Sequence, residues 1–116
     1  MSKIVQVINA MISNKEKITN VLKDKKEYFF LYNKKHKWSI ATGSDNYYYV
    51  HFYPTSNLTL EELAALDNWN DFEEYITYTT KDIKTQESDE SFTELYQIVS
   101  SKIYGLDDIF NEIINE

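Results

Sequence analysis

Apolar residues recur with a helical spacing over the first 24 positions of the chain. They form two stripes that differ in phase, at Ile4, Ile8, Met11 and Ile12 and then at Ile18, Val21 and Leu22. Ser13 and Glu16 lie between the stripes and have the spacing of a capping box, which is typical of a helix start. The pattern predicts helix over residues 1–24, either as one continuous helix or as two short helices that meet near Ser13.

The period changes to two between residues 28 and 53. Three runs are strand-like, Tyr28–Tyr32, Lys37–Thr42 and Tyr47–Tyr53, because they alternate and are rich in aromatic and β-branched residues. The two connections between these runs are short and turn-prone, which favours an antiparallel meander.

Side-chain parity gives each strand-like run two different faces. In the first run, Phe29 and Leu31 share one side, and Tyr28, Phe30 and Tyr32 share the other. In the third run, the predicted core face carries Tyr48, Val50 and Phe52. The opposite face carries Tyr47, Tyr49, His51 and Tyr53, whose amphipathic side chains tolerate contact with water. The third run is therefore predicted to be a half-buried strand.

Helical signals return after the single proline, Pro54. Thr59 and Glu62 have capping-box spacing, which predicts a short helix over Leu60–Leu66. Tyr75–Thr80 alternates and contains β-branched residues, which favours a fourth strand, and the preceding "DFEEY" is compatible with a helical turn.

Two helices are predicted at the end of the sequence. Ser91 and Glu94 have capping-box spacing at the start of an apolar stripe. That stripe consists of Phe92, Leu95, Tyr96, Val99 and Ile103. Gly105 is placed to end this helix, with Leu106 in position for the apolar contact of a Schellman motif. Asp107 is placed to cap a further short helix.

These signals predict one α+β domain over residues 1–116. An antiparallel meander of three to four strands is flanked by one or two N-terminal helices and by C-terminal helices, in the order α-β-β-β-α-β-α-α. No apolar run approaches the roughly 18 residues of a membrane span, and the first residues lack the features of a secretory signal. We expect a cytoplasmic protein that is a monomer or a weak dimer.

Charge is distributed unevenly along the chain, whose net charge is −7. Residues 1–40 contain nine lysines and three acids, whereas residues 41–116 contain three lysines and sixteen acids. Arginine, the usual bidentate reader of phosphate and guanine, is absent, which disfavours sequence-specific recognition of nucleic acid. Cysteine is absent as well, which excludes disulfides and thiolate chemistry.

The sequence offers few candidates for catalysis or metal binding. Neither histidine, His36 or His51, occurs in a metal-site spacing, and His51 has no identifiable serine or aspartate partner. Adjacent acids do not face one another on a helix or strand, and two glycines, Gly43 and Gly105, are too few for a phosphate loop. We expect no catalytic residue, no metal, no cofactor and no enzymatic activity.

Two binding surfaces are suggested by the sequence. The first combines the tyrosine face of the third strand with nearby acids and a tryptophan, and it suits a basic protein partner because aromatic residues favour interfaces and acids steer basic partners. Its predicted partner-binding residues are Tyr47, Tyr49, Tyr53, Glu61, Glu62, Asp67, Trp69, Asp71, Glu73 and Glu74. The competing interpretation is that the N-terminal helix covers this face. The second surface is the Lys/aromatic segment 23–38, which resembles a platform for single-stranded nucleic acid.

In size, acidity and the lack of a catalytic constellation, the chain is similar to small acidic bacterial immunity proteins and phage-encoded inhibitors. That similarity implies a binding protein that neutralises a basic partner, such as a nuclease toxin, by covering its cationic cleft. The alternative is a small regulatory module that binds single-stranded nucleic acid through residues 23–38.

Overall fold

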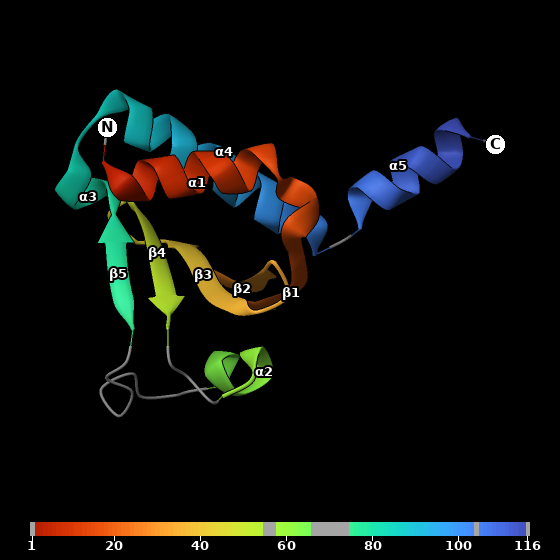
Figure 1. The fold of residues 1–116 in the computed structure, drawn as a ribbon, viewed down its shortest axis with the longest axis horizontal. Helices are drawn as coiled ribbons and strands as arrows, with labels where there is room; N and C mark the ends of the chain where they lie inside the picture. The colour runs from red at the N-terminus through yellow and green to blue at the C-terminus, as the bar shows by residue number, and fades with distance from the viewer. Residues whose placement is uncertain (1, 55–57, 66–74, 104, 116) are drawn as a thin grey trace.

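The computed structural model describes residues 2–54, 58–65, 75–103 and 105–115 (Figure 1). Within these ranges, five strands form one antiparallel sheet in the order β1-β2-β3-β4-β5. The strands are β1 (Ile18–Asp24), β2 (Glu27–Tyr32), β3 (His36–Thr42), β4 (Tyr48–Tyr53) and β5 (Ile76–Thr79). The helices are α1 (Lys3–Ser13), α2 (Leu60–Ala64), α3 (Thr80–Ile83), α4 (Gln86–Lys102) and α5 (Leu106–Ile114), with a 3₁₀ turn at Lys15–Lys17.

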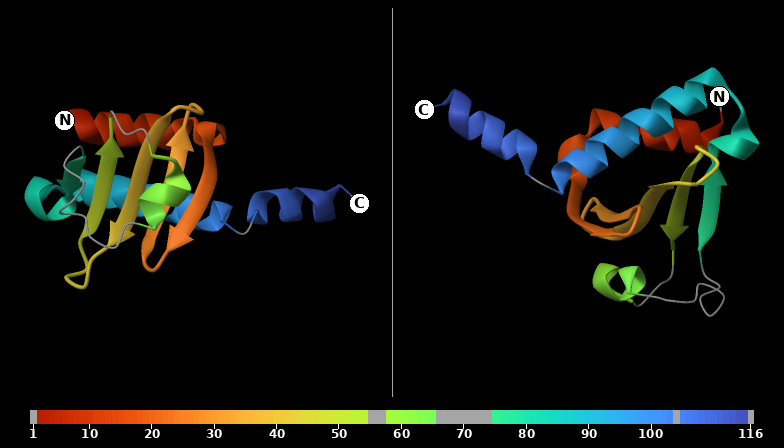
Figure 2. Two further views of the ribbon diagram at one scale, coloured as in Figure 1. Left: turned by 90° about the horizontal axis from the view of Figure 1, so that it is seen from below. Right: turned by 180° about the vertical axis from the view of Figure 1, so that it is seen from behind.

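The predicted fold class is confirmed, with one strand more than expected. Helices α1 and α4 lie side by side over one face of the sheet, and α2 lies against the other (Figures 1 and 2). The three strand-like runs correspond to β2, β3 and β4, and the predicted fourth strand is β5. In the described part of the chain, no helix combines the length and the apolar character needed to cross a bilayer.

The prediction of helix over residues 18–24 is wrong, because this segment is strand β1. A bulge lies between Thr19 and Leu22, where Asn20 adopts a left-handed φ of 59°. The extra residue places Ile18 and Val21 on the same face of the sheet, in the core beneath α1 and α4. A bulged strand therefore reproduces the three-residue spacing of a helix. The expected capping box at Ser13 is also absent, since Ser13 is the last residue of α1.

Both faces of the sheet are covered at its centre. The larger core lies under α1 and α4 and includes Phe30, Ile40 and Val50, all fully buried. The smaller core lies under α2 and includes Phe29 and Leu63. The predicted division of side chains between the two faces of the strands is confirmed. The interpretation that the N-terminal helix covers the tyrosine face is wrong, because α2 packs on that face.

Helix α2 begins as predicted. The side chain of Thr59 accepts from the Glu62 amide at 3.1 Å, and the Glu62 carboxylate accepts from the Thr59 amide at 3.0 Å. These reciprocal bonds satisfy two donors that a helix start leaves unpaired. The apolar side chains of Leu60 and Leu63 then pack onto the sheet.

The N-cap of helix α4 lies six residues before the predicted cap at Ser91. Thr85 is the N-cap, and its side chain accepts from the Ser88 amide at 3.1 Å. Ser91 is instead buried inside the helix, where its hydroxyl donates to Oδ1 of Asn9 at 2.6 Å and ties α4 to α1. The predicted stripe is confirmed, since Phe92, Leu95 and Val99 are fully buried.

Helix α5 leads away from the rest of the molecule (Figures 1 and 2). Gly105 precedes it in the left-handed region, with φ of 62°, as expected for the glycine that ends α4. The predicted cap at Asp107 is wrong, because α5 begins at Leu106 and Gly105 occupies the N-cap position. The helical turn suggested for "DFEEY" falls mainly on residues 71–74, outside the described residues.

Candidate partner-binding surfaces

The three tyrosines of the predicted partner-binding face occupy different environments. Tyr47 is exposed, Tyr49 is half-buried and Tyr53 is only 3% exposed. Tyr53 packs in the smaller core, with its ring stacked on Phe29 at 6.3 Å between centroids. The face is therefore not a continuous exposed tyrosine surface, because one of its three members is inside the protein.

Tyr49 is held by a neighbour in the turn that precedes β4. Its hydroxyl donates to Oδ2 of Asp45 at 2.6 Å, and the Tyr47 amide donates to Oδ1 of the same carboxylate at 3.1 Å. The bond to Tyr49 is the main reason why the pKa of Asp45 is lowered, and the same bond raises the pKa of the Tyr49 phenol. Asp45 thus fixes the conformation of this turn and keeps its charge.

The two predicted acids that the structure describes, Glu61 and Glu62, lie away from Tyr47 and Tyr49. Glu61 and Glu62 are exposed on α2, which packs against β1 and β2, whereas Tyr49 lies on β4 and pairs with β5. Glu62 is also engaged in the capping box of its own helix. The remaining predicted residues lie outside the described residues, and they are Asp67, Trp69, Asp71, Glu73 and Glu74.

A polar cluster on the α2 side of the sheet was not anticipated from the sequence. The Ser39 hydroxyl donates to Oε2 of Glu27 at 2.6 Å and lies 2.9 Å from the Tyr53 hydroxyl. His51 lies beside it, with Nε2 3.8 Å from the same Glu27 oxygen and Nδ1 2.9 Å from the Thr77 hydroxyl. Strands β2, β3, β4 and β5 each contribute one or more of these groups, so that the cluster spans most of the sheet.

Burial determines the protonation of this cluster. Removal from water raises the pKa of Glu27, although the hydrogen bond from Ser39 acts in the opposite direction. Burial likewise lowers the pKa of His51 to about 4 and raises that of the Tyr53 phenol. The effect of burial on His51 outweighs the attraction of Glu27, because at 3.8 Å this contact is longer than a hydrogen bond. His51 is therefore neutral at pH 7.

A cavity of about 260 Å³ lies next to the cluster and is lined by Glu27, His51, Tyr53 and Tyr75. Ser39 itself is fully buried, and its hydroxyl is bonded within the cluster, which makes it a poor nucleophile for any molecule that enters the cavity. Among the residues that the structure describes, no three His, Asp or Glu side chains converge in a way that would hold a metal ion. The cluster resembles a fixed hydrogen-bonded unit that joins the strands.

Most aromatic residues of the lysine-rich segment 23–38 are buried, and Tyr32 is half-buried. Tyr28, Phe29, Phe30 and Trp38 are all buried, and Lys23 lies over the Tyr28 ring at 5.5 Å from its centroid. Stacking on nucleobases requires exposed ring faces. The nucleic-acid alternative therefore loses most of its aromatic platform and retains mainly its lysines.

Exposed acids are concentrated on α4 in the described structure. We define the α4 acidic surface as four exposed side chains, Glu87, Asp89, Glu90 and Glu94. No basic residue occurs between Gln86 and Ser101, and none of the four acids forms an ion pair within the described part of the chain. Glu90 does accept from the Gln86 side chain at 3.1 Å.

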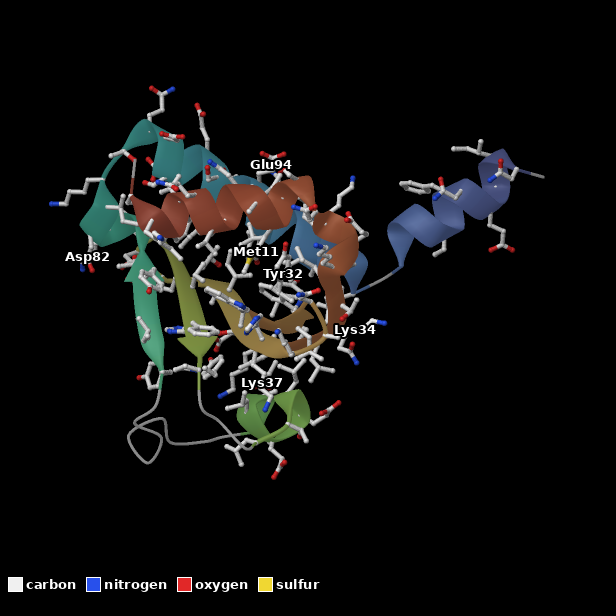
Figure 3. All side chains as sticks on the ribbon, in the orientation of Figure 1. Met11, Tyr32, Lys34, Lys37, Asp82 and Glu94 are labelled. Atoms are coloured by element: carbon white, nitrogen blue, oxygen red, sulfur yellow. The ribbon has the colours of Figure 1, made fainter. Side chains whose placement is uncertain are left out.

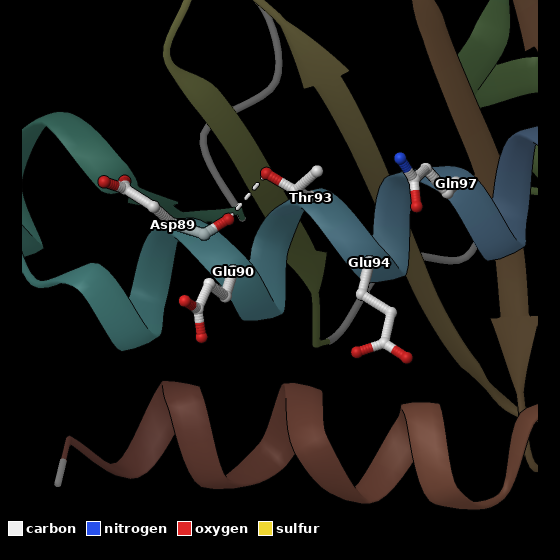
Figure 4. A pocket seen from close by; sticks show the side chains of 5 residues that line it. All are labelled: Asp89, Glu90, Thr93, Glu94 and Gln97. Carbon is white, nitrogen blue, oxygen red and sulfur yellow. Dashed lines mark hydrogen bonds between the residues drawn. The ribbon is translucent and has the colours of Figure 1, made fainter.

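The α4 acidic surface includes an open depression. Asp89, Glu90 and Glu94, together with Thr93 and Gln97, line an open depression of about 460 Å³ (Figure 4). Thr93 is held in place because its hydroxyl donates to the Asp89 carbonyl at 2.6 Å. Lys37, by contrast, lies beyond the sheet, on the side of the molecule away from Glu94 (Figure 3). The acids of α4 therefore lie apart from Lys37 of β3, whereas Lys15 and Lys102 line a second depression next to Glu94.

Comparison of the chain with protein-family models, with curated proteins and with solved structures finds no match.

Proposed function

We propose that the protein binds a basic protein partner through the α4 acidic surface. The supporting observation is that four exposed acids gather on one helix and form no ion pair within the described residues, although Lys15 and Lys102 line a depression next to Glu94. These acids contribute little to the stability of the monomer, since they form no ion pairs within the described structure. The first-turn acids, Glu87 and Asp89, gain only a modest interaction with the helix dipole.

The physical role of such a surface is to speed and orient association. A patch of one sign attracts a partner of the opposite sign over about a Debye length, and steering of this kind raises association rates by about 10- to 1,000-fold. The acids are already exposed on a formed helix, so that binding needs little reorganisation of the surface.

The partner class that fits is a protein with a cationic cleft, and a nuclease toxin is one example. Such clefts carry basic side chains that bind phosphate, and four carboxylates on one helix match those charges. Occupation of the cleft by α4 would exclude the nucleic acid. On this proposal the protein is an inhibitor or immunity protein, a class that it resembles in size and acidity.

The experiment compares two variants with the same net charge. The first, E87Q/D89N/E90Q/E94Q, neutralises the α4 acidic surface. The control, E16Q/D24N/E61Q/E112Q, neutralises four exposed acids elsewhere. Each protein is immobilised, partners are captured from cells of its source, and the amounts retained are measured by mass spectrometry.

We expect one or more basic proteins to be retained by the native protein and the control, and retention by the first variant to fall at least tenfold. Equal loss in both variants would indicate that net charge alone matters, and retention of a partner by all three proteins would contradict a role for α4.

A further inference from the structure

The apolar side of α5 is exposed to solvent in the described structure. Phe110 is 54% exposed, Ile113 59% and Ile114 77%, and Ile109 is exposed as well. Ile109, Phe110 and Ile113 follow the three- and four-residue spacing that places side chains on one helix face. A nine-residue helix gains most of its stability from packing of such a face, so that α5 requires a surface to cover it.

A groove of suitable character lies between α1 and the sheet. It has a volume of about 300 Å³ and an almost entirely apolar lining. The lining includes Val7, Ala10 and Met11 of α1 and Tyr32, Trp38 and Phe52 of the sheet. Figure 3 shows Met11 and Tyr32 close together in the layer between α1 and the sheet. Ala10 is small and exposed, which allows another helix to approach α1 closely.

Charge also matches between the helix and the groove. The sequence of α5 contains Asp107, Asp108 and Glu112 and no basic residue. The groove is bordered by the β2–β3 turn, which carries Lys34 and Lys35 between the groove residues Tyr32 and His36. An acidic amphipathic helix suits this basic border, and it is poorly suited to anionic membranes or nucleic acid.

The geometry favours a second copy over the same chain as the source of the helix. Asn9 marks the side of α1 that faces α4, because it bonds to Ser91. The groove residues Val7 and Met11, each at a helical offset of about 160° from Asn9, lie on the opposite side of α1. Helix α5 follows α4 after residues 103–105, and three residues span about 10 Å at most. This connection is too short to carry α5 of the same chain around α1.

We propose that α5 of one copy docks in the α1–sheet groove of a second copy, and that reciprocal exchange produces a weak two-fold symmetric dimer. In such a dimer there are two identical contacts, each between the α5 helix of one copy and the groove of the other, so that no helix or groove is left to bind a third copy. The dimer is independent of the α4 acidic surface, which lies on a different helix and stays available for the basic partner.

Disulfide trapping tests the contact directly, because the chain contains no cysteine. A tagged Ala10→Cys protein is mixed with an untagged Ile113→Cys protein under mild oxidation, and products are separated on a non-reducing gel. A disulfide forms only where two Cα atoms approach within about 7 Å. The matched control replaces Ile113→Cys with Asn111→Cys, which lies on the polar side of the same helix.

We expect the Ala10→Cys and Ile113→Cys pair to give at least fivefold more mixed dimer than the control pair. Dimers of Ile113→Cys alone in equal yield would show that α5 pairs with α5, and a monomeric disulfide in the A10C/I113C double variant would show docking within one chain. Either result, or no cross-link above the control, would overturn the proposal.

A measurement without cysteines gives a second readout. Phe110→Asp places a charge in the exposed apolar stripe, where it does not disturb the core. We expect sedimentation velocity to show a concentration-dependent dimer for the native protein and an association constant at least tenfold lower for Phe110→Asp. A native protein that stays monomeric at all concentrations would contradict the exchange.

Discussion

The hydroxyl of Ser39 donates a 2.6 Å hydrogen bond to the buried carboxyl group of Glu27, from β3 to β2. Ser39 is fully buried, and the pKa of Glu27 is raised by its burial. The pair shows that the second face of the sheet is a packed and specifically hydrogen-bonded layer.

Loss of the Ser39 hydroxyl should destabilise the protein. Ser39→Ala leaves Glu27 without its donor, and an unsatisfied buried polar group costs about 1–3 kcal/mol. Urea unfolding measures the change, with Ser44→Ala in an exposed turn as the control, for which we expect a change within about 0.5 kcal/mol. Equal effects of the two substitutions would contradict a structural role for the bond.

Stability should fall on acidification because of His51. Its pKa is about 4 in the folded protein, against 6.5 for an ordinary histidine, so between these values the unfolded chain binds the extra proton. Its contribution is complete above pH 6.5, decreases as the pH falls and is lost near pH 4, and it amounts to about 3 kcal/mol at most. Glu27 acts in the opposite direction, because its raised pKa favours the protonated folded state.

Two histidine variants separate these contributions. We expect His51→Gln to reduce the loss of stability between pH 6.5 and 4, and His36→Gln to leave it unchanged, since His36 is exposed. Chemical unfolding at several pH values is the measurement. Identical pH profiles for His51→Gln and the native protein would show that His51 is not buried as a neutral side chain.

Two adjacent phenylalanines should prove equally important for stability. Phe29 and Phe30 point to opposite faces of β2 and both are buried, one under α2 and the other under α1 and α4. Each change to Ala should cost about 3–5 kcal/mol, whereas Tyr47→Ala, at an exposed site, should cost far less. Thermal or urea unfolding measures these changes. A nearly neutral Phe29→Ala substitution would show that the face of the sheet under α2 is not buried.

Substitution of Thr85 tests whether this residue is the N-cap of α4. Thr85→Ala should cost about 1 kcal/mol, and Thr85→Gly only a few tenths, because glycine is tolerated at an N-cap. A neutral Thr85→Ala substitution in a urea titration would place the helix start elsewhere.

Strong periodicity explains which parts of the fold were predictable. Strands β2, β3 and β4 are rich in aromatic and β-branched residues and are separated by short turns, and the stripe of α4 is long, so that the type of each element follows from the sequence. The bulge in β1 breaks this alternation, and the resulting spacing of Ile18 and Val21 is the same in a bulged strand and a helix. A sequence pattern alone does not separate these two structures.

The polar cluster was hidden for a different reason. Glu27 and Ser39 are ordinary polar residues near the start and in the middle of strands, and no local motif marks them. They meet because β2 pairs with β3 in a particular register, with Phe29 opposite Ser39. The acids of α4 were visible in the sequence, but their position on one exposed helix depended on a start at Gln86 rather than at the predicted cap.

Binding through the α4 acidic surface is tested most directly by the association rate constant of the purified basic partner as a function of salt. We expect the rate for the native protein and for E16Q/D24N/E61Q/E112Q to fall steeply as ionic strength rises. For E87Q/D89N/E90Q/E94Q, we expect a rate at least tenfold lower at low salt and a much flatter salt dependence. Equal rates and equal salt slopes for the two variants would contradict the proposed function.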